Sequence, residues 1–151
     1  MGLDYTLSLR TDELPAAVLD FLASRFGLER MDSGGLRGTA IGLTVRTPIR
    51  DWQEMIEEGF HFTPDLLILF RIHTDHDGGE QALRLMLRAA QGLIERGGDA
   101  VLLFNGEHII LQRLQGQLVL NADYGDWTGG FGLLREIWLS HERRPLPSPL
   151  L

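Results

Sequence analysis

The chain begins with a strict alternation of apolar and polar residues, which gives way at residue 11 to an apolar repeat every three or four positions. The alternation over residues 3–9 predicts a strand. Its apolar face carries Leu3, Tyr5, Leu7 and Leu9. The repeat over residues 11–27 predicts a helix that Thr11 or Asp12 caps and Gly27 ends. Its apolar stripe consists of Leu14, Ala17, Val18, Phe21, Leu22 and Phe26.

The middle of the chain predicts a hairpin, a short helix and a buried strand. Ser33-Gly34-Gly35 lies between two apolar runs and predicts a hairpin whose second strand ends at Pro48. Residues 51–58 predict a short helix that stops at Gly59. The nearly continuous apolar run at residues 65–73 predicts a central strand buried on both faces.

The clearest helical pattern of the sequence lies within residues 78–98. Its expected buried side consists of Ala82, Leu83, Met86, Leu87, Ala90, Leu93 and Ile94. Its expected solvent side consists of Arg84, Arg88, Gln91 and Glu95. The pair Gly97-Gly98 ends the pattern.

The last third of the chain predicts three antiparallel strands joined by two tight turns. Asn105-Gly106 is a strong hairpin signal, because both residues tolerate a positive φ. Gln115-Gly116 predicts the second turn. A glycine-rich loop, an apolar element at 133–139 and a proline-rich tail at about 142–151 follow.

This order of elements predicts one α+β domain over residues 1–151. It places β-α-β-β before an irregular link and β-α-β-β-β after it. We therefore expect a mostly antiparallel sheet built from two βαββ-like halves, with the two main helices on one face.

The composition narrows the possible functions. The 151 residues include no cysteine, which excludes disulfides and thiolate metal sites. The formal net charge is −7 and no basic stripe is visible, so no nucleic-acid partner is expected. Because no apolar run approaches the roughly 18 residues that a membrane helix needs, we expect a cytoplasmic protein without a membrane span.

The segment HTDHDGGE, residues 73–80, contains the densest group of possible metal ligands. One interpretation is a metal-dependent hydrolase that uses His73 and His76. The pattern fits a helix start better, with Asp77 as N-cap and Glu80 in a capping-box position. We therefore expect no metal and no cofactor here.

Other catalytic signatures are absent from the sequence. No serine lies in a G-x-S-x-G elbow, and neither a Walker loop nor a G-x-G-x-x-G fingerprint occurs. We therefore expect a protein that is not an enzyme. One alternative is a small-molecule-binding or regulatory module with a pocket between the sheet and its helices.

Aromatic residues flanked by carboxylates indicate a surface that binds a basic protein. Two segments have this mixture, and we expect partner contacts from six residues. They are Asp51, Trp52, Glu54, Glu58, Asp126 and Trp127. The alternative is that Trp52 and Trp127 are buried core residues under a loop.

Several segments resemble the Sit-type immunity proteins, which accompany swarming-inhibition toxins that bacteria deliver to neighbours by contact. They are the opening LDYTLSLRT, the link IEEGFHFTP, the stretch GDAVLLFNGEHIILQRLQGQLVLN and the ending LPSPLL. The most specific piece is Gly98 to Arg113, together with Asn121 and Trp127. The resemblance implies a cytoplasmic immunity protein that binds and neutralises a toxin without catalysis or cofactor. The acidic charge favours a basic toxin domain as the partner.

Overall fold

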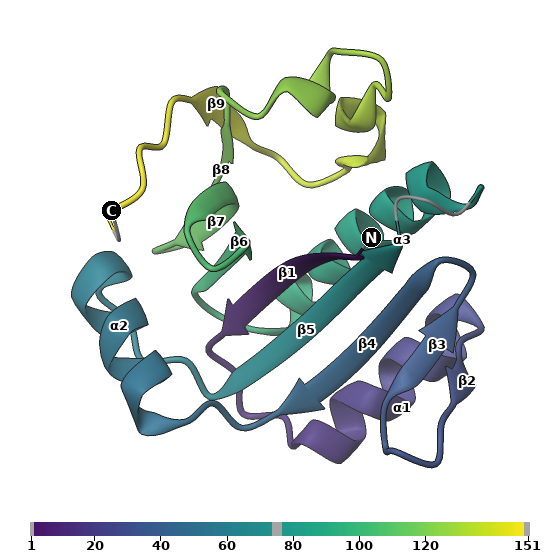
Figure 1. The fold of residues 1–151 in the computed structure, drawn as a ribbon. Coiled ribbons are helices and arrows are strands. Elements are labelled where there is room, and N and C mark those ends of the chain that lie inside the picture. The colour runs from purple at the N-terminus through teal and green to yellow at the C-terminus, as the bar shows by residue number, and fades with distance from the viewer. Residues whose placement is uncertain (1, 74–76, 150–151) are drawn as a thin grey trace.

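The protein folds around one nine-stranded sheet, shown in Figure 1. The computed structural model describes residues 2–73 and 77–149. Its strands are β1 (Gly2–Leu9), β2 (Glu29–Arg30), β3 (Leu36–Gly38), β4 (Ile41–Arg46), β5 (Leu66–His73), β6 (Ala100–Phe104), β7 (His108–Leu114), β8 (Gln117–Asn121) and β9 (Glu142–Arg144). Its helices are α1 (Pro15–Phe26), α2 (Arg50–Phe60) and α3 (Gly79–Arg96), with the short 3-10 helices η1 (Gly125–Trp127) and η2 (Leu133–Glu136).

The strand order is β2-β3-β4-β5-β1-β6-β7-β8-β9, and only the β8–β9 pair among these is parallel. The predicted α+β class with a mostly antiparallel sheet is confirmed. The two halves have opposite strand orders across the sheet. In the first half, β2 lies at the edge and β3 and β4 follow toward the centre, whereas in the second half β6 lies near the centre and β7 and β8 follow toward the other edge. Each half also contains a third strand after its helix, one more than a βαββ unit has.

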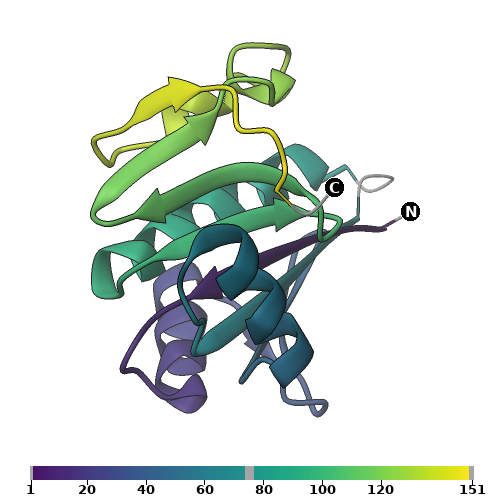
Figure 2. The same cartoon turned by 90° about the vertical axis from the view of Figure 1, so that its left-hand side faces the viewer.

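The predicted pair of main helices, α1 and α3, covers one face of the sheet, behind it in Figure 1. The main core lies in this layer and includes Leu7, Leu22, Phe70 and Leu87, each at most 1% exposed. On the other face stands α2, as Figure 2 shows. There Ile56 and neighbouring apolar residues form a second buried cluster. The strand residues of this cluster, Val101, Leu103 and Ile109, belong to β6 and β7. The predicted burial of both faces of β5 holds for its first three residues but not for Arg71 and His73, which are exposed.

The ends of the first two helices differ from their predicted positions. The first residue of α1 is Pro15, whose fixed φ suits the first turn. Leu14 precedes it with 72% of its surface exposed, so its predicted place in the apolar stripe is wrong. Gly27 ends α1 as predicted, at a φ of 63°. Helix α2 continues past Gly59 and ends before His61, which adopts a φ of 65°.

Both predicted turns of the last meander are present. Asn105 and Gly106 have φ values of 55° and 72° between β6 and β7. Gln115 and Gly116 have φ values of 53° and 81° between β7 and β8. Paired positive φ angles match the right-handed twist of the flanking strands, which is why short hairpins use them.

The C-terminal segment docks on the domain along the described part of its length. Its strand β9 adds to the sheet edge at β8. Leu146 then packs against the cluster under α2. Over residues 2–73 and 77–149, no helix is long and apolar enough to cross a membrane.

Candidate partner-binding surfaces

The outer side of α2 carries carboxylates at the predicted spacing. Asp51, Glu54 and Glu58 are exposed, whereas the opposite side of the helix packs against the sheet. Glu54 accepts a hydrogen bond from Arg50 at 2.9 Å, one turn away. Such an exposed pair contributes little to stability, so the side chains remain available for other contacts. We call Asp51, Glu54 and Glu58 the acidic α2 face.

Trp52 lies beside this face but is half-buried. Its indole Nε1 donates a hydrogen bond to Ser8 Oγ at 2.8 Å. Ser8 is fully buried in the central strand β1. The ring also packs against the apolar cluster under α2. Trp52 therefore attaches α2 to the sheet and presents only part of its ring to solvent.

Asp126 and Trp127 lie in η1, beyond the end of β8. Trp127 is 1% exposed and packs into the core on the α1 and α3 side of the sheet. Its indole Nε1 donates to the backbone carbonyl of Asn121 at 2.8 Å. Asp126 is half-buried. Trp127 thus supports the loop from beneath, and Asp126 is the accessible member of the pair.

The six predicted contact residues do not form a single surface. The acidic α2 face lies on one side of the sheet, and η1 packs on the other. A rigid partner with a flat binding surface that covers the acidic α2 face therefore does not also contact Asp126.

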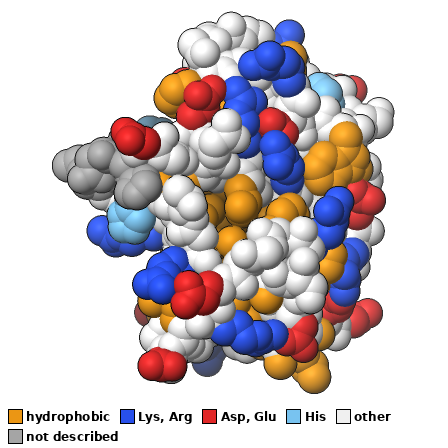
Figure 3. Space-filling model, turned by 90° about the vertical axis from the view of Figure 1, so that its right-hand side faces the viewer, with side chains coloured by type: hydrophobic (Ala, Val, Ile, Leu, Met, Phe, Trp, Pro, Cys, Tyr) orange, Lys and Arg blue, Asp and Glu red, His pale blue; other side chains and the backbone are white. Residues whose placement is uncertain are grey.

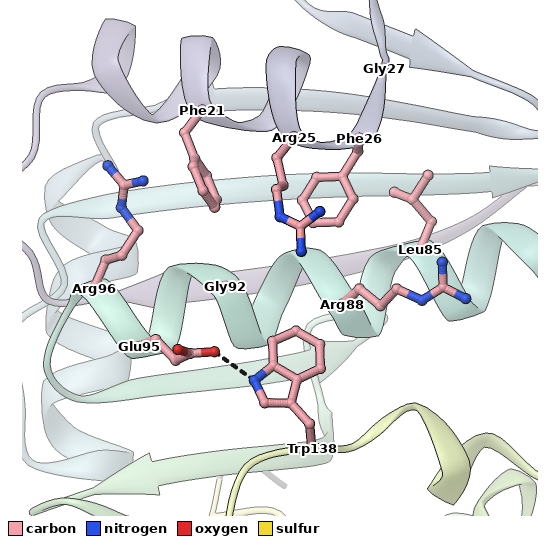
Figure 4. A pocket seen from close by; sticks show the side chains of 10 residues that line it. All are labelled: Phe21, Arg25, Phe26, Gly27, Leu85, Arg88, Gly92, Glu95, Arg96 and Trp138. Carbon is pink, nitrogen blue, oxygen red and sulfur yellow. Dashed lines mark hydrogen bonds between the residues drawn. The ribbon is translucent and has the colours of Figure 1, made fainter.

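A groove of about 560 Å³ opens on the outer side of α3, between α1 and the C-terminal segment. Phe21, Arg25 and Phe26 reach toward it from α1, and Trp138 reaches from the opposite side, as Figure 4 shows. Gly92 lies between them and supplies no side chain to the floor. We call this hollow the α3 groove. It lies outside the helix layer, in contrast to the pocket between sheet and helices that a small-molecule module predicts.

Arginines surround the apolar part of the α3 groove. The Arg96 guanidinium lies 4.1 Å from the centroid of the Phe21 ring and forms an ion pair with Glu13. Arg25 stacks 5.7 Å from the Phe26 centroid and has no carboxylate partner within the described part of the chain. Figure 3 shows hydrophobic side chains gathered on one face of the molecule among arginines. This arginine-rich, aromatic lining, which also includes Glu95, differs from the acidic α2 face.

Trp138 is fixed at its edge of the groove although 52% of it is exposed. Its indole Nε1 donates to Glu95 Oε1 at 2.6 Å. Its backbone amide donates to Gln91 Oε1 at 2.9 Å. Gln91 is fully buried and also donates to the Glu136 carbonyl at 2.8 Å. The indole is therefore held in place by both its ring and its backbone.

Ion pairs between α3 and Glu136 of η2 hold the C-terminal segment against α3. Arg84 donates to Glu80 at 2.8 Å and to Glu136 at 3.2 Å. Glu136 also accepts from Arg88 at 2.9 Å, and the arginines hold the pKa of this carboxyl below its usual value. The predicted solvent side of α3 is thus wrong for Arg84 and Gln91, which are buried. The helical repeat alone does not show that residues 131–139 cover this side.

The segment HTDHDGGE does not form the predicted capping box. Gly78, which has no side chain, occupies the N-cap position of α3. Asp77 lies one position too early, and Glu80 pairs with Arg84 instead. Of the proposed metal ligands, His73 is exposed and His76 lies outside the described residues. Within 2–73 and 77–149, no three His, Asp or Glu side chains are clustered as metal ligands.

Sequence reasoning missed the α3 groove, although one residue signals it. A glycine inside a helix costs about 1 kcal/mol relative to alanine, so Gly92 needs a structural reason. A Cβ at this position would lie 3.2 Å from Phe21 Cζ. A glycine inside a helix, opposite an aromatic residue of another helix, thus indicates that the aromatic ring packs closely against the backbone of the first helix.

A comparison with protein-family models gives one match to this chain. The model described as SitI3-like matches residues 3–130. The chain belongs to the SitI3-like family. No curated protein and no solved structure matched. Membership of the SitI3-like family confirms the resemblance to Sit-type immunity proteins. The match includes the acidic α2 face and Trp127, and it ends before Trp138.

Proposed function

We propose that the protein is a cytoplasmic immunity protein, which binds a toxin protein and neutralises it without catalysis. The SitI3-like match over residues 3–130 is the observation that carries this proposal. The role requires a stable domain with an accessible recognition surface, and it requires no reactive group or cofactor of the domain itself. An inhibitor of this kind acts by covering or distorting the working surface of its target.

The acidic α2 face is proposed as a contact for a basic surface of the toxin. Complementary charge raises the association rate and disfavours partners of the same sign. The chain has a net charge of −7, which adds long-range attraction to a basic partner. Salt should therefore slow association, because at 0.1 M it screens the attraction between exposed charges that are more than about 10 Å apart.

Surfaces beside α2 are needed to complete an interface. An 11-residue helix is about 16 Å long, whereas a stable complex buries about 800 Å² of each partner. Pro149 lies in the same shallow hollow as Met55 and Glu58, so the C-terminal segment extends the α2 surface. In this arrangement Trp52 holds the helix in position and contributes its exposed edge. Asp126 would contact only a partner that reaches round the sheet edge.

Co-expression with the adjacent open reading frame tests the proposed function. If that frame encodes the toxin, its expression alone should stop growth, and co-expression with this protein should restore it. A pull-down should then recover a stable complex. Toxicity that this protein fails to relieve, with no complex recovered, would contradict the immunity role.

Charge reversal on α2 tests the proposed contact separately. The double variant Asp51→Lys with Glu58→Lys should weaken toxin binding by about tenfold or more and slow association at low salt. Asp12→Lys with Asp32→Lys is the matched control, because both residues are exposed and the charge change is equal. Both double variants should melt like the wild type. Equal binding by the two would remove α2 from the interface while the immunity role stands.

A further inference from the structure

The α3 groove is built like a recognition site and not like an ordinary surface depression. Phe21 and Trp138 flank it, and the missing side chain of Gly92 lets the Phe21 ring lie close to the backbone of α3. Trp138 keeps 52% of its surface exposed although hydrogen bonds to Glu95 and Gln91 fix its position. A rigid, exposed tryptophan loses little conformational entropy when it is covered, which is one reason tryptophan dominates binding energies at interfaces.

One arginine of the α3 groove is free to bind a carboxylate of its occupant. Three arginines and Glu95 line it, and Glu95 accepts the hydrogen bond of the Trp138 indole. Glu13 pairs with Arg96, and Glu136 pairs with Arg88. Arg25 is exposed and lacks a carboxylate partner over residues 2–73 and 77–149. A carboxylate from outside the chain would complete it, because guanidinium groups bind carboxylates through two parallel hydrogen bonds.

We propose that the α3 groove binds an acidic segment of the toxin. One apolar side chain of that segment enters between Phe21 and Trp138, and a flanking carboxylate pairs with Arg25. This inference rests on the immunity function proposed above and adds a second contact to it. The toxin is then held through a basic surface at α2 and an acidic segment at α3. Two contacts of opposite sign reject partners that carry only one of them.

Three variants of this protein test the proposal by biolayer interferometry against the toxin domain made by cell-free synthesis. Trp138→Ala removes one wall of the groove, and Arg25→Glu reverses its free charge. Gly92→Leu fills the floor. Each should weaken binding by about tenfold, the usual effect of removing a central anchor from an interface. Melting temperatures must be measured in parallel, because a side chain at position 92 also presses on Phe21.

Two matched controls separate the groove from general surface effects. Phe131→Ala removes another exposed aromatic ring of the C-terminal segment, and Arg46→Glu reverses another exposed arginine. Both controls should bind within about twofold of the wild type, as is usual for residues outside the centre of an interface. A toxin variant with lysine in place of the contacting carboxylate should restore binding to the Arg25→Glu protein.

The outcomes distinguish this inference from the proposed function. Wild-type binding that all three groove variants retain would overturn the acidic-segment proposal and leave the immunity role intact. A loss with Trp138→Ala but not with Arg25→Glu would overturn the acidic character of the segment. A dimer of the free protein that Trp138→Ala dissociates would assign the groove to a second copy and overturn the proposal. Failure of the wild type to bind the toxin would overturn both.

Discussion

The indole of Trp127 donates a hydrogen bond to the backbone carbonyl of Asn121 at 2.8 Å, six residues earlier in the chain. The side chain of Asn121 is itself buried and joins two other segments. Its amide donates to the Ile109 carbonyl at 2.7 Å, and its carbonyl accepts from the Leu146 amide at 3.0 Å. One asparagine therefore connects β7, the η1 loop and the C-terminal segment. These bonds give a structural reason for the presence of Asn121 and Trp127 in the family-like pattern.

Replacing Asn121 by alanine should release the C-terminal segment. The change leaves the Ile109 carbonyl and the Leu146 amide without their partner, and an unsatisfied buried polar group costs about 1–3 kcal/mol. We expect the free energy of unfolding, measured in urea, to fall by about that amount. Hydrogen exchange should accelerate at residues 144–146.

Gln117→Ala is the control for this prediction. Gln117 lies on the same strand but is exposed, so its replacement should change stability by less than about 0.5 kcal/mol. If the Asn121 and Gln117 variants unfold at the same urea concentration, Asn121 does not hold the segment in solution.

The sequence predicts this fold well where local chemistry decides the backbone. Asn105-Gly106 specifies its hairpin because both residues accept the positive φ that the turn requires. The apolar repeat likewise identifies α3. Its solvent side was partly mispredicted, because Arg84 and Gln91 are buried by a segment that follows 52 and 45 positions later, respectively. The helical repeat shows which side of α3 is apolar, but it does not show which polar residues of the helix another segment of the chain buries.

The two candidate surfaces also differ in how far the sequence predicts them. The carboxylates of α2 follow from their helical spacing, because exposure of a charged helix face is the ordinary outcome. The α3 groove forms because Phe21 and Trp138 line the same hollow beside Gly92, although they are far apart in the chain. A single sequence contains no local pattern for such a meeting. Gly92, a glycine inside a helix, was the only residue of the sequence that indicated the groove.

The hydrogen bond between Trp52 and Ser8 should attach α2 to the sheet. Trp52→Phe keeps most of the ring packing but removes the indole donor, and Ser8→Ala removes the acceptor. Each change should cost about 1 kcal/mol of unfolding free energy. The double variant should cost little more than either single change, because both remove the same bond. Fully additive losses in urea unfolding would show that the bond contributes nothing.

The buried hydroxyl of Tyr124 predicts an unusual response to substitution. No hydrogen bond of good geometry to it is present within residues 2–73 and 77–149, although Tyr5 and Asp126 lie close to it. Its ring makes an edge contact with Trp127 at 5.2 Å between centroids. Tyr124→Phe keeps the ring and removes the unsatisfied group, so stability at pH 7 should stay equal or rise by up to about 1 kcal/mol. Tyr124→Ala should instead cost about 3 kcal/mol through loss of the ring. A loss above 1 kcal/mol with phenylalanine would show that the hydroxyl has a partner.

The same tyrosine should make the fold sensitive to alkaline pH. Burial raises the pKa of Tyr124 above its ordinary value, and the nearby Tyr5 and Asp126 raise it further. A raised pKa favours the neutral form in the folded state, so the stabilisation is complete below the unfolded pKa of about 10. It is lost as pH rises from there through the folded value. Melting temperatures above pH 10 should therefore fall less steeply for Tyr124→Phe than for the wild type, and parallel curves would contradict this assignment.

Glu136 should make the docking of the C-terminal segment sensitive to acid. Hydrogen bonds from Arg88, followed by the charge of Arg88 and the contacts of Arg84, lower the pKa of this carboxyl in the folded state. A lowered pKa stabilises the fold at every pH above the unfolded value of about 4.3, and the stabilisation is lost as pH falls through the folded value. Glu136→Gln should therefore cost roughly 1.5–3 kcal/mol at pH 7, the range for a hydrogen bond to a charged group.

The acid limb of the unfolding profile distinguishes this role from a general effect of charge. The stability difference between wild type and Glu136→Gln should close as the pH falls below about 4.3, because protonation makes the two side chains alike. Glu29→Gln is the control, since Glu29 and its partner Arg37 are both exposed and such pairs contribute little. A difference that stays constant down to acid pH would mean that the packing of Glu136, and not its charge, holds η2 on α3. Trp138 lies two residues beyond the end of η2, so the shape of the α3 groove depends on the same ion pairs.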